Sequence, residues 1–196
     1  MPSDRESELR AIMLGRVERS AVIDAVAELG LPDCWLAAGF VRNTVWDHLH
    51  GHEESTPLND VDIAYFDPAR VDRSVESAAA GTLRSAFPHL DFSVKNQARM
   101  HHKNGHPPYT SATDAISRWT ETCTAVGVRR GPDGLDVCAP HGLADLFALV
   151  VRPTSFDEHN LALVRTRVRD RNWLANWPLL RVEMPGEQER RHDGGD

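Results

Sequence analysis

Two aspartates, Asp60 and Asp62, stand two positions apart at the start of an apolar run in the segment LNDVDIAYFD, residues 58–67. Side chains alternate along a strand, so a strand beginning here would direct both carboxylates to one face and the intervening apolar residues to the other. Two carboxylates held side by side either raise the pKa of one of them or attract a cation. The pair is therefore a candidate metal site, with a solvated strand edge as the alternative.

A second candidate group lies upstream, in the segment AAGFVRN, residues 37–43. Gly39 allows a tight turn in which backbone amides approach a phosphate closely, and a helix that begins at this turn would direct its N-terminus toward the same anion. Arg42 and Asn43 would lie in the first helical turn, where their side chains add hydrogen-bond donors. The alternative is a strand-to-helix turn without a ligand.

Strands and helices must alternate along the chain to position these residues. Short apolar or β-branched runs bounded by turn residues predict strands, and apolar residues at helical spacing predict helices. We expect strands at residues 34–40, 61–66 and 90–98, a hairpin at 122–130 and 135–140, and helices at 16–30, 41–51, 69–87, 142–151 and 157–177. Glycine and two prolines within residues 101–111 predict a loop without regular structure, which is a candidate lid.

The glycine turn, the helix start and the D-x-D strand together resemble the core of the nucleotidyltransferase superfamily that includes DNA polymerase beta and the tRNA CCA-adding enzymes. The longer stretches GFVRNTVWD, VKNQARMH and APHGLADLFALVVRP are similar to a little-characterised bacterial family of nucleotidyltransferase-like proteins, and they extend the resemblance over most of residues 35–153. The resemblance implies an α/β (α+β) nucleotidyltransferase fold, with a small mixed β-sheet flanked by helices and an additional C-terminal hairpin and helices. One departure is Phe40, because the superfamily usually has a second glycine or a serine after the first glycine.

In the superfamily the glycine turn opens a helix and the D-x-D strand binds divalent metal, so the resemblance implies that Asp60 and Asp62 hold Mg²⁺ or Mn²⁺. A third carboxylate on a neighbouring strand usually completes the site. Asp91 is the candidate, because it alternates with Ser93 and Lys95 onto one face of the next predicted strand. The alternative for Asp91 is a polar strand start.

Further polar residues gather after Asp91 and are candidate contacts to base, ribose or triphosphate: Lys95, Asn96, Arg99 and His101. Surface ion pairs are the alternative for each of them. Near the C-terminus, arginines at positions 165, 167, 169 and 171 fall on several helical faces. This spread predicts a solvated basic helix, with phosphate contact as the alternative.

The resemblance implies a metal-dependent transfer of a nucleoside monophosphate from a nucleoside triphosphate to an acceptor, with release of pyrophosphate. The acceptor is unidentified and could be a small molecule, an RNA or a protein. One alternative is a catalytically inactive nucleotide-binding or regulatory protein on the same fold. Another is a partner-binding module of the toxin-antitoxin type.

The size and charge of the chain limit these functions. The length of 196 residues suffices for one core, so we predict a single domain over residues 1–184 and a polar tail over 185–196. A formal charge of -7 argues against an extensive nucleic-acid clamp. The charged start and the lack of an apolar run of roughly 20 residues predict a cytoplasmic protein without a membrane span.

Overall fold

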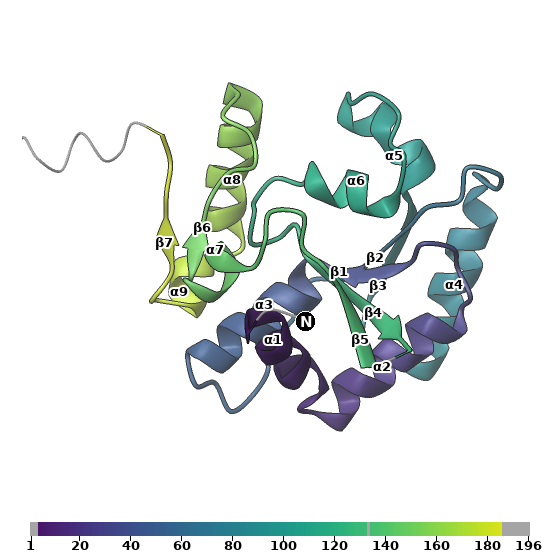
Figure 1. Ribbon diagram of the computed structural model, residues 1–196, viewed down its shortest axis with the longest axis horizontal. Coiled ribbons are helices and arrows are strands. Elements are labelled where there is room, and N and C mark those ends of the chain that lie inside the picture. The colour runs from purple at the N-terminus through teal and green to yellow at the C-terminus, as the bar shows by residue number, and fades with distance from the viewer. Residues whose placement is uncertain (1–3, 133, 186–196) are drawn as a thin grey trace, which may run out of the picture.

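The computed structural model describes residues 4–132 and 134–185, and its centre is a five-stranded mixed sheet (Figure 1). The strands are β1 (Trp35–Ala37), β2 (Val61–Tyr65), β3 (Phe92–Asn96), β4 (Gly127–Gly131) and β5 (Gly134–Cys138), in the spatial order β3-β2-β1-β4-β5. Strands β2 and β3 run parallel, and every other neighbouring pair in this sheet is antiparallel. The small mixed sheet predicted from the sequence is confirmed.

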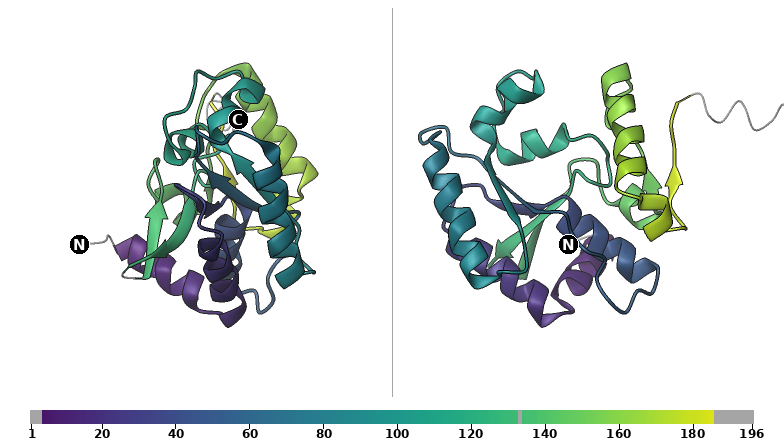
Figure 2. Two further views of the ribbon diagram at one scale, coloured as in Figure 1. Left: turned by 90° about the vertical axis from the view of Figure 1, so that its right-hand side faces the viewer. Right: turned by 180° about the vertical axis from the view of Figure 1, so that it is seen from behind.

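Helices cover both faces of this sheet (Figure 2). The first four are α1 (Asp4–Leu14), α2 (Val17–Glu28), α3 (Gly39–Leu49) and α4 (Arg73–Ala86). They contribute Leu9, Val22, Trp46 and Leu83 to the larger hydrophobic core, which also contains the apolar side chains of β2 and β3. The opposite face carries a smaller core against α6 (Ala112–Ser117).

Strand β2 places its side chains as the alternation predicts. Val61, Ile63 and Tyr65 are buried in the larger core, whereas Ala64 belongs to the smaller core on the other face. Asp62 therefore lies on the face of Ala64. The larger core holds the strand in register and leaves the opposite face for the candidate site.

The C-terminal third forms α7 (Ala144–Phe147), β6 (Val150–Val151), α8 (Glu158–Asp170), α9 (Trp173–Asn176) and β7 (Arg181–Val182). Strands β6 and β7 make a separate parallel pair. Trp173 and Trp177 pack edge-on against Trp46 of α3, with ring centroids 5.4 and 5.1 Å apart. The Trp177 Nε1 also donates a hydrogen bond to Asp47 at 2.8 Å. These contacts fix the position of α8 relative to the sheet.

Several elements differ from the sequence-based expectation. The helix predicted over residues 142–151 is limited to α7, and the last two residues of that range form β6, while the helix predicted over 157–177 is divided into α8 and α9. Helix α1 was not predicted, and the predicted hairpin extends the main sheet beside β1 rather than forming an addition to it. The third strand ends at Asn96, whose side chain accepts a hydrogen bond from the Ala98 amide and caps α5 (Gln97–Asn104). Gly105 ends that helix with φ 68°, so the first part of the predicted loop is helical.

Two sequence-based predictions concern the extent of the chain. The predicted boundary of the domain at residue 184 stays a prediction, and residues 186–196 of the predicted tail lie outside the described residues. Among the described helices, none has the length and apolar character that crossing a membrane requires.

Candidate active site

The two aspartates of the D-x-D segment meet at one hollow. Asp60 precedes β2, and Asp62 stands in register with Ala37 of β1 and Ser93 of β3. Both aspartates line a hollow of about 210 Å³. Within residues 4–132 and 134–185, neither carboxylate accepts a hydrogen bond or forms an ion pair. Burial, followed by the charge of Asp60, raises the pKa of Asp62 to about 6.

This pair of carboxylates fits a hard divalent cation. Carboxylate oxygens without a protein partner have the chemistry that Mg²⁺ and Mn²⁺ prefer. Mg²⁺ is commonly held by one or two carboxylates together with water and substrate phosphates. The part of the chain that the structure describes contains no group of three His, Cys, Asp or Glu side chains placed to hold a metal. Among the described residues, Asp60 and Asp62 are the carboxylates that line this hollow.

The turn from β1 into α3 lines the same hollow. Ala38 adopts φ 51° and ψ −122°, a conformation that favours glycine, and its amide donates to the Val126 carbonyl at 3.0 Å. Gly39 begins α3, whose first amides have no acceptor within the helix. The residue with the backbone angles that favour glycine is therefore Ala38, ahead of Gly39. Phe40, where the superfamily usually has glycine or serine, is a buried residue of α3 with helical backbone angles, so glycine is not required there.

Two arginines at the C-terminal end of α8 complete the hollow: Arg167 lies in the last turn of the helix, and Arg171 directly follows it. Arg167 and Arg171 lie one helical turn apart and both line the hollow together with Asp60 and Asp62. Their charges oppose the rise in the pKa of Asp62. Cations on one side and carboxylates on the other are the arrangement that binds a phosphate chain through a bridging metal and through direct hydrogen bonds.

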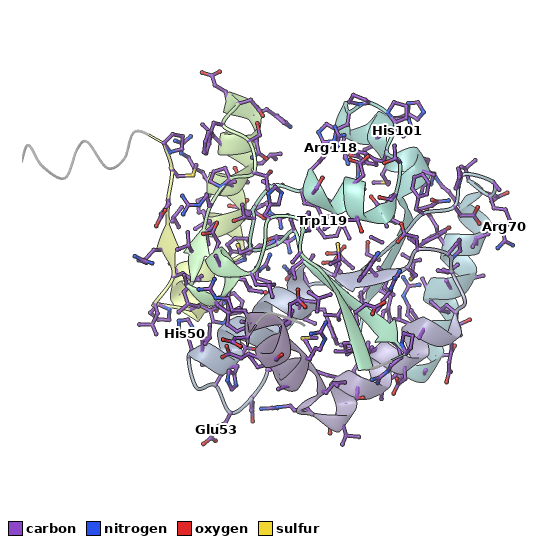
Figure 3. The ribbon with its side chains drawn as sticks, in the orientation of Figure 1. His50, Glu53, Arg70, His101, Arg118 and Trp119 are labelled. Atoms are coloured by element: carbon purple, nitrogen blue, oxygen red, sulfur yellow. The ribbon has the colours of Figure 1, made fainter. Side chains whose placement is uncertain are left out.

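A larger cleft of about 800 Å³ adjoins the hollow and shares Ala38, Asp62 and Arg167 with it. The cleft lies between α5 and α6 on one side and α8 on the other (Figure 1). Figure 3 shows Arg118 and Trp119 at the end of α6 nearest to α8. Asp62 thus stands where the smaller hollow opens into the larger cleft, whose volume is in the range of small-molecule sites.

A comparison with protein families identifies the family of the chain. Residues 24–182 match a family described as nucleotidyltransferase. The chain belongs to this nucleotidyltransferase family. A comparison with curated proteins found no match.

Solved structures give the same fold for this nucleotidyltransferase. A protein whose NMR structure reveals a CCA-adding enzyme head domain is 33% identical, with a TM-score of 0.79 over 91% of this chain and 95% of that one. A CCA-adding enzyme in complex with CTP is 15% identical, with a TM-score of 0.55 over 94% of this chain and 44% of that one. The Thermotoga maritima CCA-adding enzyme in complex with tRNA is 17% identical, with a TM-score of 0.56 over 93% and 43%. This chain therefore spans less than half the length of those two enzymes.

Asp91 of the nucleotidyltransferase does not join the two aspartates. Its carbonyl accepts a hydrogen bond from the Val61 amide at 2.8 Å, but its carboxylate is 66% exposed and pairs with Arg84 of α4 at 3.2 Å. It lines neither the hollow nor the cleft. The residue of β3 beside Asp62 is Ser93, so the position of Asp91 does not support the predicted third carboxylate.

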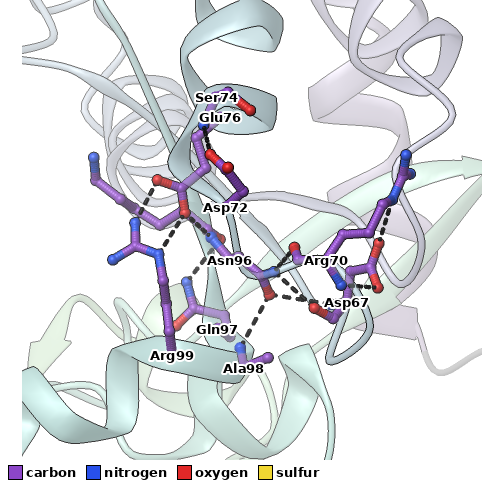
Figure 4. Close-up of polar contacts among 10 residues, drawn as sticks. Asp67, Arg70, Asp72, Ser74, Glu76, Asn96, Gln97, Ala98 and Arg99 are labelled. Atoms are coloured by element: carbon purple, nitrogen blue, oxygen red, sulfur yellow. Dashed lines mark hydrogen bonds and ion pairs between the residues drawn. The ribbon is translucent and has the colours of Figure 1, made fainter.

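The predicted nucleotide contacts on β3 and α5 divide into two groups. Lys95 lines the cleft. Asn96, by contrast, is fully buried, and its Nδ2 donates to the carbonyls of Asp67 and Arg70 (Figure 4). Its backbone amide donates to Glu76 at 2.7 Å. Asn96 therefore joins the loop after β2 to α4 and α5 and does not face the cleft.

Arg99 and His101 also lie away from the cleft. Arg99 forms an ion pair with Glu76 on α4 (Figure 4). His101, labelled on α5 in Figure 3, is buried with its ring centroid 3.9 Å from that of His102. The predicted nucleotide contact is not supported by the position of either residue, because α5 turns these side chains toward α4 and toward its own neighbours.

Arg42 lines the hollow but is only 2% exposed. Its Nη1 donates to Thr124 Oγ1 at 2.7 Å, and its Nε and Nη2 donate to Asn43 Oδ1 at 3.2 and 2.9 Å. The guanidinium also lies over the rings of Trp46 and Trp173, at 5.0 and 4.2 Å from their centroids. Burial lowers the pKa of Arg42 to about 10. Asn43 serves mainly as the acceptor for Arg42, so both residues stabilise the α3 turn.

Arg167 and Arg171 were assigned from the sequence to a solvated helix, with phosphate contact as the alternative. In the structure these two residues line the hollow together with the aspartates, while Arg165 and Arg169 line a separate surface groove. The signal in the sequence was the four-residue spacing of positions 167 and 171, which puts both on one helical face. Nothing local showed that this face would meet the aspartates.

Proposed function

We propose that this nucleotidyltransferase transfers a nucleoside monophosphate from a nucleoside triphosphate to an acceptor and depends on Mg²⁺ or Mn²⁺. The observation that carries the proposal is the pair of unpartnered carboxylates, Asp60 and Asp62, on a hollow that also receives Arg167, Arg171 and the start of α3. Solved CCA-adding enzymes in complex with CTP or ATP support a nucleoside triphosphate as the donor.

Asp60 and Asp62 would hold the metal, which neutralises phosphate charge as it develops during transfer. Arg167 and Arg171 would bind oxygens of the leaving pyrophosphate through their guanidinium groups. The acceptor oxygen forms a bond to the α-phosphorus, the bond from that phosphorus to the bridging oxygen breaks, and pyrophosphate leaves with the electron pair. The acceptor proton passes to solvent. The larger cleft would hold the base, the ribose and the acceptor.

The test is transfer of label from each of the four nucleoside triphosphates, labelled at the α-phosphate, to a metabolite mixture and to RNA. Each reaction contains Mg²⁺ or Mn²⁺, and pyrophosphate is measured in parallel. We expect a labelled product that disappears in the double variant Asp60→Asn and Asp62→Asn.

Asp91→Asn is the matched control, because this carboxylate lies outside the hollow and pairs with Arg84. The control should keep full activity. Loss of transfer in Asp91→Asn would support Asp91 as the third carboxylate predicted from the sequence. Full activity of the double variant would refute Asp60 and Asp62 as the metal ligands.

A second candidate function is nucleotide binding without turnover. It is favoured because residues 4–132 and 134–185 contain no cluster of three potential metal ligands, so no third carboxylate joins Asp60 and Asp62. This function predicts that nucleoside triphosphate with metal raises the melting temperature while no pyrophosphate is released with any acceptor. The measurements described above separate the two functions.

A further inference from the structure

Glu121 is a fully buried acidic residue behind the hollow. It lies in the segment between α6 and β4, where its carbonyl accepts hydrogen bonds from the amides of Thr124 and Ala125. Its Oε1 accepts a hydrogen bond from the Arg167 Nε at 2.7 Å. Its Oε2 is buried and has no hydrogen-bond partner. A buried carboxylate is costly unless it is paired, so the ion pair with Arg167 calls for a physical explanation.

The packing of α8 does not by itself fix Arg167. Val164 is the one fully buried residue among the thirteen of this helix. The start of α8 is attached by Asn160, whose Nδ2 donates to the Thr120 carbonyl at 3.2 Å. An arginine side chain on an exposed helix samples many rotamers, and ordering it costs conformational entropy. The guanidinium carbon of Arg167 lies 5.8 Å from the centroid of the Trp173 ring, and the contact with Glu121 fixes the Nε as the side that faces the protein before any ligand binds.

The contact also determines which donors of Arg167 remain free. Glu121 uses the Nε, and Arg167 makes no other hydrogen bond to the part of the protein that the structure describes. Both Nη groups therefore stay available at the junction of the hollow and the cleft. Arg42 differs, because its Nε, Nη1 and Nη2 all donate to Thr124 or Asn43. Two Nη groups in a fixed plane are the fork that binds phosphate oxygens.

We infer that Glu121 is a positioning residue, which holds the Arg167 guanidinium at the junction of the two spaces so that its Nη groups bind the triphosphate. This inference rests on the proposed function. The inference predicts the direction in which nucleotide affinity changes, because the negative charge of Glu121 by itself repels a nucleotide. Removal of that charge should tighten binding if charge alone matters, whereas removal of the positioning contact should weaken it.

The test measures the dissociation constant of a nucleoside triphosphate with Mg²⁺ for variants whose folding is checked by their melting temperature. Glu121→Met fills a similar volume but removes the acceptor, and we expect binding about tenfold weaker, as for the loss of roughly one charge-assisted contact. Glu121→Gln keeps an acceptor for the Nε and should bind nearly as the unsubstituted protein does. Combining Glu121→Met with Arg167→Met should bind no more weakly than Arg167→Met alone.

The matched control is Glu76→Met, which removes another buried carboxylate paired with an arginine, Arg99, but lies outside the hollow and the cleft. We expect its dissociation constant to be unchanged. Arg167→Lys is a second test that leaves Glu121 intact and keeps the charge but loses the fork, and it should bind about tenfold more weakly.

Two results would overturn the inference while the proposed function stands. One is unchanged or tighter binding by folded Glu121→Met, and the other is normal binding by Arg167→Lys. If the unsubstituted protein bound no nucleoside triphosphate with either metal, the proposed function would fail, and the inference would fail with it.

Discussion

At the scale of single residues, the candidate site combines two acids that lack partners with a buried arginine, Arg42, whose hydrogen-bond donors are satisfied. Asp62 is half-buried beside Asp60 without a hydrogen bond or ion pair in the described part of the chain, whereas Arg42 is satisfied by Thr124 and Asn43. An unpaired buried acid costs folding free energy unless a ligand compensates it. The two acids are therefore suited to a cation, and Arg42 is suited to stabilising the turn.

Asp62→Asn should stabilise the protein without metal at neutral pH. The pKa of Asp62 is about 6 in the folded protein and about 3.9 in an unfolded chain, so the folded state binds more protons between these values. Stability therefore falls as the pH rises from about 4 to about 6, and the full cost is present above pH 6. We expect the variant to gain about 1–3 kcal/mol at pH 7 and little near pH 4, as measured by urea denaturation.

The exposed Asp91 provides the control for this measurement, because Asp91→Asn should change the unfolding free energy by less than about 1 kcal/mol at either pH. An equal effect of Asp62→Asn at both pH values would show that its charge carries no cost in the folded protein.

Arg42→Lys should lower the melting temperature. A lysine cannot reproduce the hydrogen bonds to Thr124 and Asn43 or the contact with the rings of Trp46 and Trp173, and the loss should cost about 2–3 kcal/mol. The role predicted for Arg42 from the sequence, a hydrogen-bond donor to phosphate, implies the opposite, namely weaker nucleotide binding with little change in stability. Calorimetric unfolding and nucleotide titration of the same variant separate these two roles. Weaker nucleotide binding with an unchanged melting temperature would show that Arg42 binds phosphate.

At the scale of elements, the junction of β1 and α3 determines how phosphate can approach. The chain reverses direction between Ala37 and Gly39, and Ala38 takes the strained conformation that this reversal requires. A side chain at this φ and ψ costs of order 1–3 kcal/mol, which the packing of β1 and α3 must offset. The strain lies beside the hollow, where backbone amides begin α3.

Ala38→Gly should therefore stabilise the protein by about 1 kcal/mol, since the relief of strain exceeds the entropy that glycine loses on folding. Ala37→Gly is the matched control, because Ala37 is an equally buried alanine in β1 without positive φ, and it should destabilise by a similar amount. Both are measured by chemical denaturation. A loss of stability in Ala38→Gly comparable to that of Ala37→Gly would mean that the turn stores no strain.

At the scale of the whole molecule, the site depends on contact between segments that are far apart in the sequence. The aspartates lie at β2 of the main sheet, while Arg167 lies in α8 and Arg171 directly follows it. The stack of Trp46, Trp173 and Trp177 holds the next helix, α9, against α3. The larger core itself includes Trp173, Trp177 and Met184. One continuous core predicts one cooperative unit.

We therefore expect residues 1–184 to unfold in a single transition. Tryptophan fluorescence of a variant with Trp35→Phe and Trp119→Phe, which keeps the three tryptophans of the stack, should give the same denaturant midpoint as far-ultraviolet circular dichroism, which reports all helices. A midpoint from fluorescence clearly below that from circular dichroism would show that the C-terminal third detaches first, and would divide the predicted domain into two.

The sequence by itself determined the short-range features of this protein. Alternation along β2 placed Asp60 and Asp62 away from the core, and the glycine turn and the D-x-D strand together indicated the family, because strand periodicity and turn chemistry act over a few residues. The local sequence did not show that Ala38, rather than Phe40, has the backbone angles that favour glycine. Those angles are imposed on the turn by the positions of β1 and α3.

Only the tertiary structure decided which distant polar residues serve the site. Asn96 and Arg99 follow β3 closely in the sequence, but α5 directs them toward Glu76 and the loop after β2. Arg167 lies 105 positions after Asp62 and still reaches the same hollow, because tryptophan packing places α8 beside the aspartates and Glu121 orients the guanidinium. Such contacts depend on how helices pack against the sheet, and the spacing of residues along a single element carries no information about that packing.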